Sequence, residues 1–151
     1  MELLSKIKKL TSEFGVSGDE KRVSAVAAEL LSEYSDQVEI DDFGNVTGFI
    51  PCGIEGAPTL MLDAHIDQIG FIVTEITDGG FLRFMSIGVD QRMLPGSELA
   101  VLTRDGVIRG VVGTIPAIMQ KDESASIPLT DMTVDIGMTG EEARKVVRVG
   151  D

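Results

Sequence analysis

The sequence predicts two parts of different fold class: an α/β part that extends to about Asp67, and an all-β part that follows it. Apolar residues recur at helical spacing up to residue 31, and an apolar run over 60–64 is short enough for a strand buried on both faces. After Asp67, short apolar runs alternate with glycine-containing turn pairs, which is typical of a small β-barrel or sandwich. A boundary near Asp67 is therefore expected.

Two helices and a strand pair are expected before the apolar run. Helical spacing from Leu3 to Phe14 predicts a first helix that ends at Gly15. The sequence Ser17-Gly18-Asp19-Glu20 has the pattern of a capping box, so we expect Ser17 to cap a second helix over about 21–31. Alternation over 38–40 and 46–50 predicts two paired strands, and a loop over 51–58 then leads to the strand at 60–64.

Short strands are expected throughout the second part, at residues 69–75, 81–86, 99–104, 107–112 and 132–136. Asp105-Gly106 lies between two apolar runs, which is a strong signal for a hairpin. Residues 120–126 are polar and are expected to form a mobile loop. The sequence Thr139-Gly140-Glu141-Glu142 has the pattern of a second capping box and predicts a short helix that ends near Val147.

Composition and charge limit the classes of partner. The net charge of −12 argues against nucleic acid, whose phosphates require Lys and Arg, and disfavours an anionic membrane surface. The N-terminus lacks the pattern of a signal peptide and no apolar run has the length of a membrane span, so we expect a cytoplasmic protein. Cys52 has no activating basic neighbour and is interpreted as an incidental thiol.

The only histidine of the chain, His65, closes the apolar run and stands two residues before Asp67. Alternate residues of a strand share a face, so the two side chains are expected side by side at the end of a strand, where ligands bind in open α/β sheets. A histidine there can ligate a metal while the carboxylate orients its ring. A catalytic metal needs about three protein ligands, and a hydrogen-bonded structural histidine remains the alternative interpretation.

Ordered motifs along the chain carry a family resemblance. The segments Phe14 to Glu20, Asp41 to Asn45 and Ala64 to Phe71 resemble the beginning of a dinuclear metallo-aminopeptidase, and residues 106–113, 134–137 and 149–151 fit as well. The chain is similar to the deblocking, glutamyl and tetrahedral aminopeptidases, some of which are labelled endoglucanases or cellulases. The resemblance extends along essentially all 151 residues.

The resemblance implies a fold, a site and an assembly. Residues 1–67 would be the N-terminal portion of an α/β catalytic domain, 68–149 an inserted β-barrel-like dimerisation domain, and 150–151 the return to the catalytic domain. His65 would be a metal ligand and Asp67 the catalytic residue that orients and polarises it. Two divalent ions, zinc or cobalt, would activate a water that releases N-terminal residues from peptide substrates. Dimers would build a larger homo-oligomer, usually a dodecamer.

This sequence departs from the family pattern at two positions and in length. Gln68 stands where the family commonly has glutamate, and the stretch 115–118 lacks a histidine that the family often carries. The general base and the remaining ligands match no position here, so we expect the chain alone to hold no two-metal site and to be inactive. The alternative is a non-catalytic oligomerisation or binding module. Glycoside hydrolysis is disfavoured because it needs two opposed carboxylates, and without Trp the chain has few aromatic side chains for stacking sugars.

Overall fold

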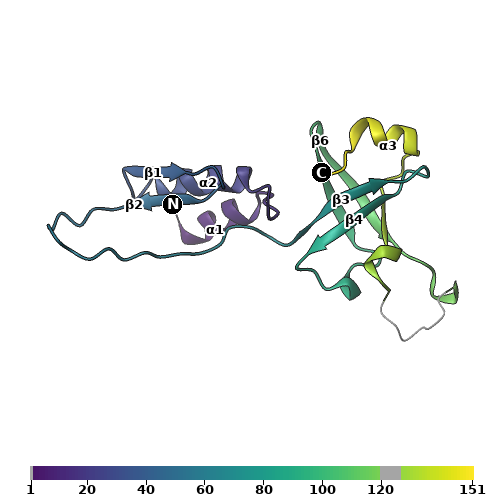
Figure 1. The fold of residues 1–151 in the computed structure, drawn as a ribbon, viewed down its shortest axis with the longest axis horizontal. Helices are drawn as coiled ribbons and strands as arrows, with labels where there is room; N and C mark the ends of the chain where they lie inside the picture. Colours follow the sequence, from purple (N-terminus) through teal and green to yellow (C-terminus); the bar gives the residue numbers. More distant parts are fainter. Residues whose placement is uncertain (1, 120–126) are drawn as a thin grey trace. The chain divides into compact units, whose positions relative to one another are not determined.

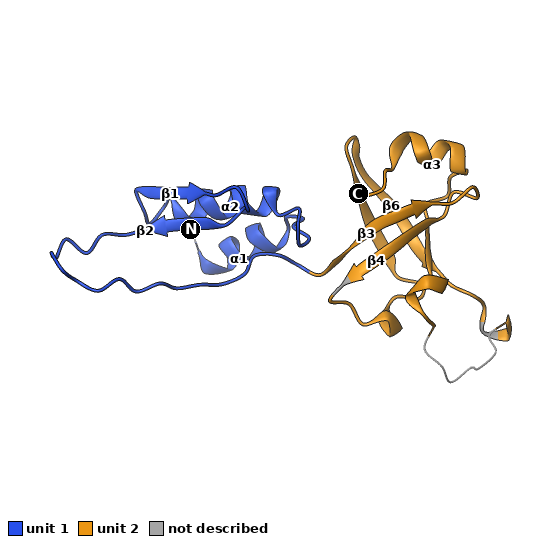
Figure 2. Cartoon of the chain, in the orientation of Figure 1, with its two compact units in different colours: residues 1–68 blue, residues 69–151 orange. Residues whose placement is uncertain are grey.

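The structure, a computed structural model, describes residues 2–119 and 127–151. The chain divides into two compact units, residues 1–68 and residues 69–151 (Figure 2). The mobile loop that the sequence predicts at 120–126 lies outside the described residues. No helix in the described part of the chain combines the length and the apolar character needed to cross a membrane.

The first unit contains two helices and a two-stranded antiparallel sheet (Figure 1). Their bounds are α1 Leu3–Thr11, α2 Lys21–Leu31, β1 Gln37–Ile40 and β2 Val46–Phe49. Helix α2 contacts both strands, and the Ser24 hydroxyl on this helix donates to the carbonyl oxygen of Gly44 at 2.8 Å. These elements confirm the sequence predictions, except that α1 ends at Thr11 rather than continuing to Phe14.

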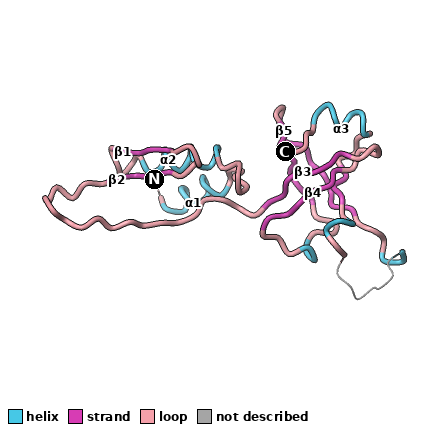
Figure 3. The backbone as a smooth tube through the Cα atoms, in the orientation of Figure 1, coloured by secondary structure: helices cyan, strands magenta, loops and turns pink. Residues whose placement is uncertain are grey.

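The apolar run over residues 60–64 is not a strand, and this prediction is wrong for the chain as it stands. Figure 3 shows the segment as loop, and Leu60, Met61 and Leu62 are 84%, 82% and 89% exposed. A strand buried on both faces requires hydrogen-bonding neighbours and covering helices. No strand within the described residues pairs with this segment, so its sequence preference is not realised.

The second unit is built on a five-stranded antiparallel sheet with strand order β3-β4-β7-β6-β5. The strands are β3 Gly70–Ile76, β4 Leu82–Ile87, β5 Glu98–Thr103, β6 Gly106–Gly113 and β7 Thr133–Asp135, which confirms all five predicted strands. Short 3-10 turns occur at Gln91–Met93, Ala117–Met119 and Leu129–Asp131. Helix α3, Gly140–Val146, begins with the predicted capping box at Thr139 and Glu142.

The core of the second unit lies between the two halves of this sheet. Buried side chains come from the β3–β4 hairpin and from β5, β6 and β7, and Ala143 of α3 adds a fully buried residue. Leu82, Val112 and Met132 are at most 2% exposed. One cluster of buried residues thus joins all five strands and α3, and the sheet itself is open, with β3 and β5 as its edge strands.

The last residues of the chain are hydrogen-bonded to β3. The amide of Gly150 donates to the Val73 carbonyl at 2.9 Å, and the Val73 amide donates to the Asp151 carbonyl at 2.9 Å. Gly150 has a φ of +99° in the turn that precedes Asp151. The end of the chain is therefore held against the edge strand β3 of the second unit by backbone hydrogen bonds.

Candidate functional site

The two residues that the sequence selected lie in contact within the first unit. The Nδ1 atom of His65 is 2.8 Å from Oδ1 of Asp67. The expected juxtaposition is present, although it is made in an irregular segment rather than on a strand. The His65 side chain is 86% exposed and that of Asp67 is 35% exposed. This hydrogen bond is therefore the contact that orients an otherwise open imidazole.

A third residue, Ser17, completes the group, and sequence analysis assigned it a different role. Its hydroxyl donates to Oδ2 of Asp67, the oxygen that His65 does not use. The predicted capping box is wrong: the N-cap of α2 is Glu20, without a side-chain capping bond, and Oε1 of Glu20 accepts from the Gly18 amide at 2.7 Å. Sequence analysis missed the Ser17–Asp67 hydrogen bond because it is a tertiary contact between residues that are far apart in sequence.

Backbone contacts bring the two segments of the site together. The amide of Gln68 donates to the Gly15 carbonyl at 2.8 Å, and Val16 forms a parallel bridge with Gln68. Gly15 must be small, because a Cβ there would lie 2.5 Å from Cγ1 of the buried Val23. The loop that carries Ser17 is thus fixed on one side by α2 and on the other by the segment that carries Asp67.

The hydrogen bonds set the protonation of the site. The Ser17 hydroxyl, and after it the His65 ring, holds the pKa of Asp67 below its ordinary value, so this carboxyl is ionised. An ionised carboxylate only accepts hydrogen bonds, so a neutral His65 must carry its proton on Nδ1. The lone pair of Nε2 is then available to an electrophile, and a divalent metal ion is the usual one.

The described residues fit a metal centre in part. His65 with Asp67 behind it has the arrangement of a histidine ligand and its orienting carboxylate. No group of three or more His, Cys, Asp or Glu side chains in residues 2–119 and 127–151 could hold an ion. The described residues therefore offer one candidate ligand, His65, with its hydrogen-bond partners, and a complete centre would require additional ligands.

Gln68, at a position where the family pattern has glutamate, directly follows Asp67, but its side-chain hydrogen bond is not to the Asp67 carboxylate. Its Nε2 donates weakly to the Glu13 carbonyl at 3.4 Å. The neutral amide therefore contributes to holding the segment against the end of α1. Asp41 also has a local role, because its carboxylate accepts from the Phe43 and Asn45 amides at 2.9 Å in the turn between β1 and β2.

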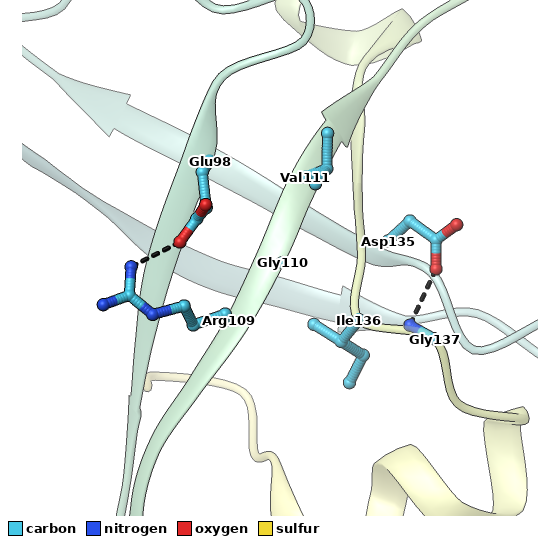
Figure 4. A pocket seen from close by; sticks show the side chains of 7 residues that line it. All are labelled: Glu98, Arg109, Gly110, Val111, Asp135, Ile136 and Gly137. Carbon is cyan, nitrogen blue, oxygen red and sulfur yellow. Dashed lines mark hydrogen bonds and ion pairs between the residues drawn. The ribbon is translucent and has the colours of Figure 1, made fainter.

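The second unit carries an open hollow on its sheet. Figure 4 shows its lining from β5, β6 and the end of β7: Glu98, Arg109, Gly110, Val111, Asp135, Ile136 and Gly137. Arg109 forms an ion pair with Glu98, and Oδ1 of Asp135 accepts from the Gly137 amide at 2.8 Å. These interactions explain the charged side chains as structural, so the hollow shows no arrangement for catalysis.

Comparison with known proteins gives a consistent family. The model of the M42 glutamyl aminopeptidase family matches residues 44–151. A putative aminopeptidase of Acetivibrio thermocellus is 32% identical over 99% of this chain and 43% of its own length. The lysyl aminopeptidase of Pyrococcus furiosus is 33% identical over 90% of this chain and 40% of its own length. The chain thus spans about two fifths of the length of these relatives.

Solved structures agree with the sequence relatives. The TET aminopeptidase of a marine-sediment Thaumarchaeota archaeon superposes with a TM-score of 0.89 at 32% identity, covering 98% of this chain and 42% of that one. A protein of Thermotoga maritima described as an endoglucanase superposes with a TM-score of 0.77 at 29% identity, over 96% of this chain and 42% of that one. With the family model matching most of its length, the chain belongs to the M42 glutamyl aminopeptidase family.

Proposed function

We propose that this chain is the N-terminal portion of a metal-dependent aminopeptidase, in which His65 is a metal ligand and Asp67 orients it. The observation that carries the proposal is the hydrogen bond between His65 Nδ1 and Asp67 Oδ1 in a chain of the M42 family. Peptides with a free N-terminus are the substrates, as the names of the lysyl and glutamyl aminopeptidases among the relatives suggest.

The side chains present would prepare a ligand rather than carry out hydrolysis. Asp67 holds the His65 ring by accepting a hydrogen bond from its Nδ1–H group. This bond makes the lone pair of Nε2 a stronger ligand for zinc or cobalt. A pair of such ions, when bound, supplies an activated water and polarises the scissile carbonyl. Because the described residues contain no group of three or more side chains that could hold an ion, the isolated chain is expected to be inactive.

Residues 1–67 would belong to the catalytic domain, 68–149 to an inserted dimerisation domain, and 150–151 to the return of the chain. A TET peptidase of Pyrococcus horikoshii, 34% identical over 99% of this chain and 45% of its own, is described as assembling into a tetrahedron or an octahedral shell. We infer that the protein carrying this chain self-associates in a similar way, with a homodimer as the first step. A cytoplasmic location accompanies this proposal.

Two measurements test the enzymatic proposal. Purified chain with added Zn²⁺ or Co²⁺ is assayed for release of N-terminal residues from a peptide panel, and no release is expected. The native protein that carries this sequence is then examined by intact mass and metal analysis. A mass more than double 16.2 kDa with two ions per chain supports the proposal. A mass near 16.2 kDa without stoichiometric metal contradicts it.

The second candidate is a non-catalytic self-association module, which one observation favours. The 69–151 unit has its own core, and it exposes Met85, Val107 and Val111 by 53%, 50% and 48%. Light scattering on the purified chain separates the candidates when it is combined with the metal analysis above. A stable dimer that holds no metal in its native form would favour the module.

A further inference from the structure

We propose that Ser17 is a positioning residue for the metal ligand, because its hydroxyl fixes the Asp67 carboxylate that orients His65. The inference rests on the proposed function of His65 and adds a third residue to that site. Ser17 lies outside the segment that carries the histidine, and the two segments meet only through tertiary contacts. Ser17 therefore links its own loop, through Asp67, to the orientation of the His65 ring on the other segment.

The geometry of the carboxylate gives the first argument. Asp67 uses its two oxygens on different partners, Oδ1 on the His65 ring and Oδ2 on the Ser17 hydroxyl. Rotation about the terminal torsion of an aspartate is soft, so one hydrogen bond does not select a single orientation. A second bond to the other oxygen of the same planar group does. With Ser17 bound to Oδ2, the direction of Oδ1 toward His65 is determined.

The exposure of the ring gives the second argument. The His65 side chain is 86% exposed, so packing does not hold the imidazole in place. Its orientation depends on Asp67, and the orientation of Asp67 depends on Ser17. Because the ring is oriented only by these two linked hydrogen bonds, the loss of either bond is expected to change the orientation of the ring.

The loop around Ser17 is itself well held, which is necessary for an anchor. The Asp19 amide donates to the Val16 carbonyl at 2.8 Å, and Gly18 adopts a φ of +94° in this turn. The Gln68 amide bonds to the Gly15 carbonyl at 2.8 Å on the other side. Ser17 is half-buried, and its hydroxyl makes no capping bond to α2. Its hydrogen bond to Asp67 is therefore the function of this side chain that the structure supports.

The single histidine makes the inference directly measurable without metal and without an activity assay. Long-range ¹H–¹⁵N spectra of the chain report the tautomer of His65, at a pH well above the ordinary histidine value of about 6.5. In the native chain we expect the Nδ1–H form to predominate, because Asp67 accepts that proton. Titration of Zn²⁺ alone, followed on the same ring signals, then gives an apparent Kd.

Matched variants isolate the hydroxyl. Ser17→Thr and Ser17→Val differ from one another only in a hydroxyl against a methyl group, so both test the same added volume. Ser17→Thr is expected to keep the native tautomer and Kd. Ser17→Val is expected to lose the predominance of the Nδ1–H form and to weaken Zn²⁺ binding about tenfold, the lower end of the range for outer partners of metal ligands. Ser12→Ala, which removes an exposed hydroxyl bonded to the Lys9 carbonyl, is the control without effect.

The outcomes separate this inference from the proposed function. If Ser17→Val has the tautomer and Kd of Ser17→Thr, the role of Ser17 is refuted, whatever the role of His65. If a His65→Ala variant of the longer native protein keeps its full complement of metal ions, His65 is not a ligand and the proposed function fails instead. Loss of the native amide spectrum in both Ser17 variants would indicate a purely structural residue and would also overturn the inference.

Discussion

At Asp67, one carboxylate receives two hydrogen bonds, and the charge on this group controls the neighbouring ring. We expect Asp67→Asn to weaken divalent metal binding at His65 by about 10–100-fold, the range typical of an altered outer partner of a ligand. The amide keeps the size of the side chain but no longer carries the charge that favours the Nδ1 proton. Zn²⁺ titration of the native and variant chains measures the effect, with Asp42→Asn as a control, and equal affinities would contradict it.

A second prediction at the residue scale concerns Asp90 in the second unit. Its carboxylate accepts from Nε of Arg92 at 3.0 Å and from the second guanidinium nitrogen at 2.6 Å, and these bonds lower its pKa from 3.8 to about 2. Because the folded-state pKa is depressed, the stabilisation is present above pH 3.8 and is lost as the pH falls through about 2. The contribution is small, since both side chains are exposed.

Carbon-detected NMR titration of the Asp90 carboxyl checks this expectation. Arg92→Ala is expected to return the midpoint toward the ordinary aspartate value, because the guanidinium contact is the first cause of the shift. Arg109→Ala removes a guanidinium whose ion pair is with Glu98, and it should leave Asp90 unchanged. A midpoint near 3.8 in the native chain would show that the pair does not form in solution.

At the scale of elements, Gly110 allows β7 to lie close to β6. A Cβ at this position would lie 2.5 Å from Cγ1 of Val134 and 2.9 Å from Cγ2 of Ile136, both buried side chains. We expect Gly110→Ala to lower the free energy of unfolding by about 1–3 kcal/mol, as overpacking does in a filled core. Gly113→Ala on the same strand is the matched control, because its nearest atoms lie at 3.9 Å. Urea unfolding of both variants decides the point, and equal losses would refute it.

Elements whose conformation is determined by neighbouring residues in the sequence could be predicted. The β5–β6 hairpin lies where Asp105-Gly106 indicates it, since Thr103 pairs with Gly106, and α3 begins with the expected capping box. The irregular conformation of residues 60–64 could not be predicted. Their composition favours a strand, but a strand forms only beside neighbours that the local sequence does not report. Ser17 is a similar case, because its local pattern fits a helix cap while the folded chain offers it Asp67.

At the scale of the whole molecule, the two units differ in how much apolar surface they bury. Among the described residues, the 69–151 unit has a connected core of eleven buried residues, whereas the buried apolar side chains of the first unit are Val23, Ala27 and Leu30 of α2. Local opening costs less where fewer apolar contacts must be broken. The stability of the chain is therefore expected to be uneven, with the sheet of the second unit as the most resistant part.

Hydrogen exchange measured by mass spectrometry tests this order. Amides of β4, β6 and β7 are expected to exchange slowest, those of α1 and α2 faster, and those of residues 50–64 at rates close to an unfolded chain, because this segment lacks strand partners. In the longer native protein that the proposed function requires, Leu60, Met61 and Leu62 should become protected, since a strand of this composition is stable only when covered on both faces. Equal exchange at 60–64 in both proteins would show that these apolar side chains are not part of a central strand, and it would remove the structural basis for placing His65 at the end of one.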